Sequence, residues 1–122
     1  MKRRALLFAL AAIGCDHPDL TTVEFTPVTT PPVDVLLSQE RIELPAGIAV
    51  AVDVKVFDDA GEEVASAKSE LVDDVGAVQF LPTKIEDRSI LAGDREGEAT
   101  LSFQADFHDG TLSVPVVVIP QN

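Results

Sequence analysis

Ile48-Ala49-Val50-Ala51-Val52-Asp53-Val54-Lys55-Val56-Phe57 is the stretch of this sequence that decides the fold. A β-branched side chain stands at every second position from Ile48 to Val56, so an extended chain would gather all of them on one face. In a helix the same side chains would lie on every side, and β-branched residues are also disfavoured there. The stretch therefore predicts a strand with one buried face.

Shorter alternating stretches lie on both sides of this strand, and turn-forming residues separate them. They occupy residues 33–37, 41–44, 69–72, 77–81, 89–92, 99–107 and 112–119. Short strands with turn signals roughly every 8–12 residues are typical of a sandwich of two sheets. We therefore predict an all-β chain that forms an immunoglobulin-like β-sandwich of about seven to eight antiparallel strands. Pro115 has no N–H group, so the last strand is expected to be an edge or to carry a bulge.

The first fifteen residues have the layout of an export signal. Three basic residues at positions 2–4 precede an apolar run over residues 5–13, which is far shorter than the roughly 20 residues that span a bilayer. Ala12-Ile13-Gly14-Cys15 then resembles the lipoprotein signal of bacteria, with Ala12 in place of the usual Leu. The resemblance implies cleavage before Cys15 and attachment of lipid to its thiol. An ordinary signal peptide, with Cys15 incidental, is the alternative.

This interpretation divides the chain into a lipoprotein signal peptide (1–14), a tether (15–32) and the sandwich (33–122). The tether segment holds four of the eight prolines and five threonines, which favour an extended, disordered chain. Its expected reach is on the order of 50 Å. A short strand at Val23–Phe25, or packing of Phe25 on the domain, is left open by the sequence.

The charge of the chain restricts its partners. Without the signal peptide, six Lys and Arg residues stand against 21 Asp and Glu residues, a net charge of −15. That balance argues against nucleic acid and against a second contact with an anionic membrane surface. A solvated acidic surface is the simpler interpretation, and affinity for cations or for a basic partner is the alternative. Cys15 is the only cysteine, so the domain has to be stable without disulfides.

Three stretches resemble the bacterial immunoglobulin-like domain of group 2. Ser38–Gly47 resembles its opening strand and turn, Val54–Val64 its strand B, and Ile90–Gly93 with Glu96–Leu101 its late hairpin. The resemblance covers roughly residues 33–119 and departs from the family pattern in lacking the Trp-Ser pair of strand C. It implies a spacer, adhesion or binding domain of the cell envelope, without a shared catalytic site.

Catalytic chemistry has little support in the sequence. The two histidines, His17 and His108, lie in the tether and in a hairpin turn, and no serine stands in a pattern that would pair with either. We therefore expect no enzyme activity, no catalytic residues and no bound cofactor.

A calcium site in the acidic turns is the alternative that we keep. Asp58, Asp59 and Glu62 follow one strand, and Asp106 and Asp109 follow another. Turns at one end of a sandwich lie close together, and calcium takes 6–8 oxygen ligands, often from such carboxylates. None of these residues has the spacing of a calcium-binding loop, so acidic turns in water are the simpler interpretation and no metal is the primary expectation.

The sequence thus predicts a non-catalytic interaction or spacer domain, exported from the cytoplasm and anchored in the cell membrane or outer membrane by lipid on Cys15. We expect a partner protein in the envelope, recruited by strand addition to a sheet edge, with Leu112–Ile119 as one candidate. A calcium-binding adhesion domain is the alternative function.

Overall fold

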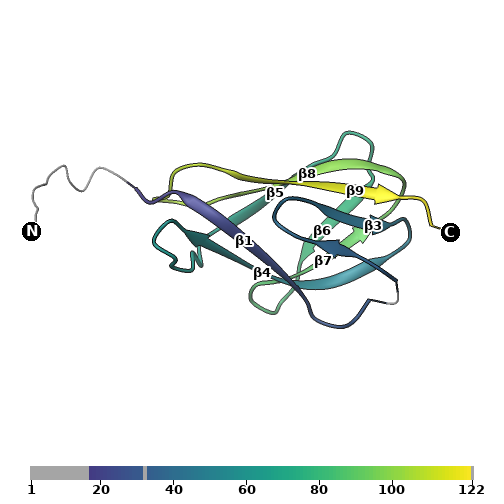
Figure 1. Ribbon diagram of the computed structural model, residues 1–122, viewed down its shortest axis with the longest axis horizontal. Helices are drawn as coiled ribbons and strands as arrows, with labels where there is room; N and C mark the ends of the chain where they lie inside the picture. The colour runs from purple at the N-terminus through teal and green to yellow at the C-terminus, as the bar shows by residue number, and fades with distance from the viewer. Residues whose placement is uncertain (1–16, 32, 122) are drawn as a thin grey trace, which may run out of the picture.

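The structure, a computed structural model, describes residues 17–31 and 33–121. Within these residues the chain forms nine strands and no helix (Figure 1). The strands are β1 (Leu20–Pro27), β2 (Leu36–Leu37), β3 (Ile42–Pro45), β4 (Ala49–Asp58), β5 (Lys68–Val72), β6 (Val78–Pro82), β7 (Arg88–Gly93), β8 (Gly97–Gln104) and β9 (Leu112–Ile119).

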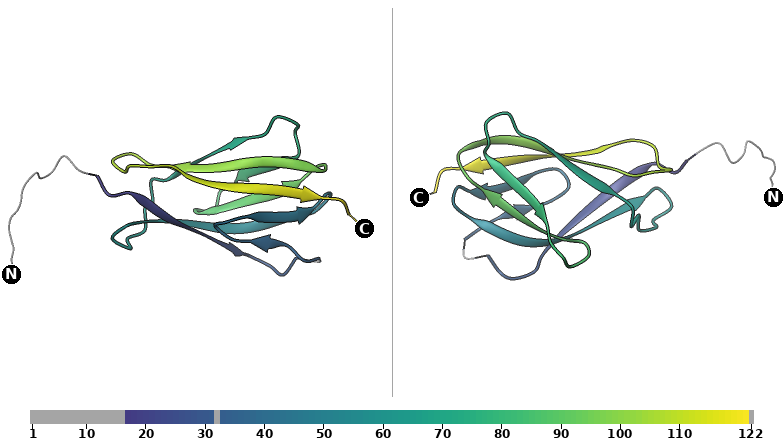
Figure 2. Two further views of the ribbon diagram at one scale, coloured as in Figure 1. Left: turned by 45° about the horizontal axis from the view of Figure 1, so that its top comes forward. Right: turned by 180° about the vertical axis from the view of Figure 1, so that it is seen from behind.

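The strands form two sheets packed face to face, as the two views of Figure 2 show. One sheet has the order β1-β4-β7-β6 and the other β2-β3-β9-β8-β5. All neighbouring strands are antiparallel except β3 and β9, which run parallel. The predicted all-β, immunoglobulin-like sandwich is confirmed, with nine strands in place of seven to eight and with one parallel pair.

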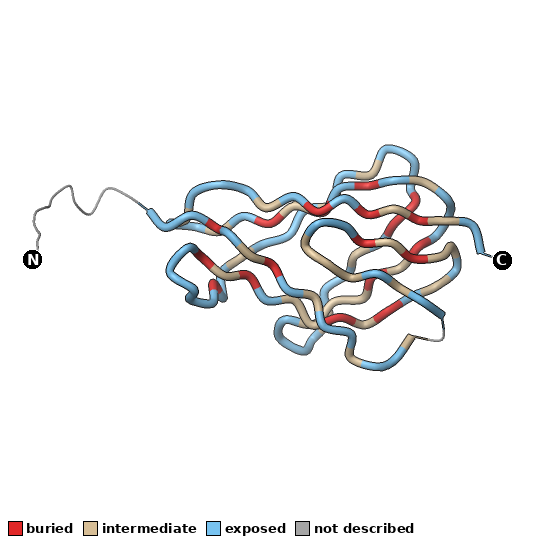
Figure 3. Tube along the Cα trace, viewed as in Figure 1, coloured by how far each residue is buried: buried red, intermediate tan, exposed pale blue. Residues whose placement is uncertain are grey.

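The core lies between the sheets and follows the predicted alternation. In β4, Val50, Val52 and Val56 are buried, and in β8 and β9 every second residue is buried (Figure 3). Both sheets supply the largest completely buried side chains, which are Ile42, Leu44, Val52, Leu91, Leu101, Val114, Val116 and Val118. Burying each of them contributes about 1.5–3 kcal/mol, which lets a domain without disulfides stand on its core.

The domain begins earlier than the predicted boundary at residue 33. Residues 20–27 of the expected tether form β1, which pairs with β4 in register from Leu20↔Asp58 to Pro27↔Val52. Val23 is 2% exposed, and the partly buried Phe25 packs against the core 6.0 Å from the ring of Phe103. The tether prediction is therefore wrong over these residues, and the short-strand alternative is what the structure contains.

A register shift explains why β1 was hard to recognise. The pairing with β4 is irregular between Leu20 and Thr22, so the buried residues are Leu20 and Val23, three positions apart. Strict alternation is lost at such a bulge because one extra residue is inserted on one strand. Pro27 ends the strand, where its missing N–H costs no ladder hydrogen bond.

The last strand is a sheet edge only in its first half, which includes Pro115. β9 pairs with β8 along its length and with β3 from Val116 to Ile119, so its second half lies inside the five-stranded sheet. Pairing with β3 starts directly after Pro115, and only the first half of β9 lacks a strand neighbour on that side. Strand addition at Leu112–Ile119, as first predicted, would have to displace β3.

The two ends of the described chain lie at opposite ends of the long axis (Figure 1). Residue 17 is at the end where β1 begins, and Gln121 follows β9 at the other. The proposed signal peptide and Cys15 fall outside the described residues. Among the residues that are described, no helix is long and apolar enough to cross a membrane.

Candidate functional site

Two predicted acidic turns meet at the end of the sandwich where β1 begins. The Asp59 N–H group donates to the Asp19 carbonyl at 2.9 Å, and the Leu20 N–H group donates to the Asp109 carbonyl at 3.0 Å. The start of β1 therefore lies between the turn after β4 and the turn after β8. The same convergence brings the side chains of Asp58 and His108 within 3.6 Å of each other.

Asp58 is the one buried charged residue among those described, with 6% of its surface exposed. Its side chain faces inward, as do those of Val52 and Val56 in β4. Its carboxylate therefore lies at the end of the core, at a position where a valine would continue the pattern. Its Oδ1 atom accepts hydrogen bonds from the N–H groups of Ala60 and Glu62, both at 3.0 Å. The bond from Glu62, followed by those from Ala60 and His108, holds the pKa of Asp58 below its usual value against the opposing effect of burial.

The His108 ring links the two turns. Its Nδ1 atom lies 2.9 Å from the Asp106 carbonyl, and its Nε2 atom faces Asp58 Oδ2. A neutral imidazole has a single N–H group and can donate to only one of these oxygens, whereas the imidazolium donates to both. The Asp58–His108 pair thus joins the two turns and stabilises this end of the sandwich. It contains only one carboxylate.

The remaining predicted calcium ligands do not gather around that carboxylate. Asp59, Glu62, Asp106 and Asp109 are all exposed, and Glu62 contributes its N–H group to the turn. Among residues 17–31 and 33–121, no group of three or more His, Cys, Asp or Glu residues is arranged to hold a metal ion. The arrangement uses Asp58 to close a turn, as aspartate commonly does through local N–H groups.

A groove of about 380 Å³ opens elsewhere, between the two sheets. β4, β5, the turn that follows β4 and the β6–β7 hairpin form its walls. Phe80 and Phe103 line its apolar part together with Val64, while Lys68 and Glu86 are among the charged side chains that line it. The groove thus combines an apolar part with several charged and polar groups, and clefts that present both kinds of group are common binding sites.

The groove exists because β7 is shorter than β4. Their pairing runs from Ala49↔Ala92 to Asp53↔Arg88, after which β4 continues to Asp58 without β7 beside it. The four-stranded sheet therefore has a gap next to the second half of β4. β5 belongs to the other sheet, where it pairs with β8, and does not fill the gap.

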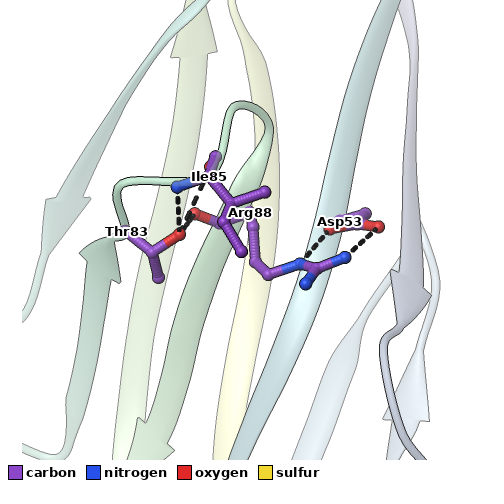
Figure 4. Close-up of polar contacts among 4 residues, drawn as sticks. All are labelled: Asp53, Thr83, Ile85 and Arg88. Atoms are coloured by element: carbon purple, nitrogen blue, oxygen red, sulfur yellow. Dashed lines mark hydrogen bonds and ion pairs between the residues drawn. The ribbon is translucent and has the colours of Figure 1, made fainter.

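The β6–β7 hairpin that borders the groove is held in place by polar contacts (Figure 4). Arg88 binds both carboxylate oxygens of Asp53, with Nε–Oδ1 at 2.9 Å and Nη2–Oδ2 at 3.3 Å. This hydrogen-bonded pair lowers the pKa of Asp53 and raises that of Arg88. At the tip, the Thr83 hydroxyl accepts a hydrogen bond from the Ile85 N–H group at 3.1 Å and lies 3.0 Å from the Arg88 carbonyl. The bidentate pair ties the hairpin to β4 and so fixes one wall of the groove.

The outer edge of β1 is occupied by a side chain. Gln39 accepts a hydrogen bond from the Val23 N–H group at 3.3 Å and donates to the Thr21 carbonyl at 2.9 Å. Its amide therefore takes the place that a residue of a neighbouring strand would have.

Sequence reasoning did not find the groove, because its walls come from segments that are distant in sequence. No local motif marks Phe80, Phe103 or Lys68, and their meeting depends on where β7 stops relative to β4. Sequence reasoning did anticipate that the turns carrying Asp58 and His108 would lie together, since turns at one end of a sandwich converge.

Comparison with known proteins gives no family assignment. No protein-family model matches the chain, and no curated protein does. Among solved structures, the chain is similar to domains 4 and 5 of the S-layer protein SbsC, with 15% sequence identity and a TM-score of 0.47. The match covers 96% of this chain and 55% of that one, so this chain spans about half of the matched structure. Similarity at this level carries no information on function.

Proposed function

We propose that this protein is a non-catalytic interaction domain of the cell envelope, held close to a membrane by lipid on Cys15. The observation that carries the proposal is the short separation between Cys15 and the folded domain. Four residues lie between Cys15 and Leu20, where β1 begins. Five Cα steps span at most about 18 Å, so a lipid on Cys15 would keep this end of the sandwich near the bilayer surface.

That end of the sandwich carries one large exposed apolar side chain beside the acidic turns that follow β4 and β8. Phe107 is 79% exposed, and its ring lies 6.2 Å from that of His17, two residues after Cys15. A single large apolar side chain at the end nearest the anchor would meet the bilayer interface with little cost. The opposite end, which holds the turn after β3 and Gln121, would point away from the membrane and toward other envelope components.

We also propose that the sandwich is of the group 2 bacterial immunoglobulin-like type. Each of the three stretches that resemble this family corresponds to strands and turns of the fold, and β5 and β6 lie between the second and the third stretch. Ser38–Gly47 covers β3 and its following turn, and Val54–Val64 covers the end of β4 and its turn. Ile90–Gly93 and Glu96–Leu101 cover the end of β7 and the start of β8. The family implies a spacer or binding role, and fold alone does not distinguish between them.

The non-catalytic part of the proposal is supported by how the ionisable groups are used. Asp58 closes the turn after β4, His108 links it to the turn after β8, and Asp53 ties Arg88 to the sheet. Each of these groups already has a structural partner, so none is left poised as a base or nucleophile in a cleft.

Membrane fractionation of cells that express the Cys15→Ser variant tests the anchor. We expect Cys15→Ser to appear in the soluble fraction or to accumulate uncut. A Gly14→Ala variant, which keeps a small residue before the cysteine, should be processed and membrane-bound as in wild type. Normal cleavage and membrane retention of Cys15→Ser would show that Cys15 is not the anchor.

A further inference from the structure

Three of the four outer edge strands of the sandwich, β1, β6 and β2, are poorly suited to strand addition, whereas the fourth, β5, pairs only with β8. Gln39 occupies the edge of β1, as described above. On β6, the Asp73 carboxylate accepts a hydrogen bond from the Val78 N–H group at 2.7 Å, and Pro82 ends the strand without an N–H group. β2 is only two residues long. Short edges, side-chain caps and edge prolines are the usual means of preventing edge-to-edge pairing.

The groove contains a different kind of edge, the second half of β4. The Val54 N–H group donates to the Asp87 carbonyl at 2.8 Å, and the Val56 carbonyl accepts from the Val64 N–H group at 2.7 Å. Backbone groups of alternate residues face the same side of a strand, so the Val54 carbonyl and the Val56 N–H group point toward this gap as well. Neither has a hydrogen-bond partner within the described part of the chain.

These two groups form a slot for one residue. In parallel pairing, a single residue donates its N–H group to one carbonyl and accepts from the N–H group two residues further along the neighbouring strand. The Val54 carbonyl and the Val56 N–H group, on either side of Lys55, have this relation. A free N–H group on Val56, a residue that is only 4% exposed, is costly unless something binds it.

The charges around the slot indicate which kind of peptide would fit. Three of the six Lys and Arg residues that follow Cys15 line this groove, namely Lys55, Lys68 and Arg88, and so do the acidic residues Glu63, Glu86 and Asp87. Arg88 is paired with Asp53, and Lys55 lies 4.0 Å from Glu63. Lys68 has no ion pair among the described residues, although the chain as a whole is strongly acidic. Lys68 is therefore an unpaired cation in the groove that also holds the two unpaired backbone groups, and Glu86 and Asp87 line the groove without an ion pair among the described residues.

We propose that the groove binds an extended peptide segment of a partner protein, which carries one carboxylate for Lys68 and an apolar residue. One residue of the segment pairs with the Val54 carbonyl and the Val56 N–H group, and a nearby carboxylate binds Lys68. An apolar side chain of the segment packs against Phe80 and Phe103. The inference rests on the interaction role proposed above and does not depend on lipid at Cys15.

Selection of linear heptapeptides from a random displayed library, with the full chain purified in detergent as bait, tests this inference. We expect enriched peptides to combine Asp or Glu with an apolar residue. Lys68→Glu should weaken their binding at least about tenfold, the effect of losing one charge-assisted hydrogen bond. The matched control is Lys84→Glu, which makes the same charge change at a position of the β6–β7 hairpin that does not line the groove and should leave binding within about twofold.

A variant without any charge change separates the groove from general electrostatics. Ser69 lies on the exposed edge strand β5 and lines the groove, so Ser69→Trp should fill it without disturbing the core. Binding should be lost in this variant while far-UV circular dichroism remains that of wild type. In ¹⁵N-labelled protein, the Val56 amide signal should shift when the selected peptide is added.

Three outcomes would overturn the inference: no enriched peptide, equal binding to Lys68→Glu and Lys84→Glu, or amide shifts confined to β1 and β2. These outcomes leave the proposed envelope location untouched, because that is tested by the fractionation of Cys15→Ser. Normal cleavage and membrane retention of Cys15→Ser, together with peptide binding, would in turn refute only the proposed anchor and leave the groove proposal intact.

Discussion

Truncation of one side chain in β1 tests whether the segment expected to be a tether is part of the fold. Val23 is 2% exposed and packs in the core, so Val23→Ala removes two methyl groups from a buried site. At about 0.8 kcal/mol per buried carbon, the loss of transfer free energy is about 1.6 kcal/mol. The cavity left behind raises the total to roughly 2–3 kcal/mol. For a domain of this size, that lowers Tm by about 10 °C.

Urea unfolding followed by far-UV circular dichroism measures this effect, since the chain has no Trp or Tyr for fluorescence. The matched control is Val33→Ala, which removes the same atoms from a side chain that is 38% exposed and lies at the boundary expected from the sequence. It should change the free energy of unfolding by less than about 0.5 kcal/mol. If Val23→Ala unfolds at the same urea concentration as wild type, β1 does not contribute to the core and the tether interpretation is restored.

Three further substitutions test other features of the structure. Burial raises the pKa of Asp73, but hydrogen bonds from the following backbone N–H groups lower it to a net value below the usual one. Its carboxylate therefore stabilises the fold above the unfolded-state pKa of about 3.9, and this contribution is lost as the pH falls. Urea titrations at several pH values should accordingly show a steeper acid loss for wild type than for Asp73→Asn. Gly97 has φ +156°, and an added Cβ would lie 2.9 Å from Val75 Cγ2, so Gly97→Ala should cost roughly 1–3 kcal/mol in calorimetric unfolding. Gln39→Leu should speed hydrogen exchange of the Val23 amide, measured by NMR, and unchanged exchange would show that Gln39 does not cap β1.

Strands with strict alternation could be predicted from the sequence, whereas pairing that depends on distant segments could not. β4 begins and ends within one residue of the predicted stretch because its β-branched residues recur at every second position. β1 was obscured by its bulge near Leu20 and by the surrounding prolines, which suggested an extended tether. The parallel pairing of β3 with β9 has no local signal, since register between distant strands is set by the whole core.

The same distinction holds for the candidate sites. The meeting of the turns that carry Asp58 and His108 follows from the sandwich fold, so it was accessible from sequence. The use of Asp58 to bind backbone N–H groups was not, because that depends on the conformation of one turn. The groove arises from a difference in length between β7 and β4, and its unpaired Val54 and Val56 groups are visible only once the pairing is known.

The placement of β1 determines how the domain would respond to mechanical load. β1 leads directly from the end where the chain enters, and it is paired with β4 over its full length. At the opposite end β9 leaves the sandwich between β3 and β8. Tension applied between these ends acts along both strands, so the hydrogen bonds beside them are loaded in shear and must fail together. A domain connected in this way resists extension better than one whose terminal strands peel away one bond at a time.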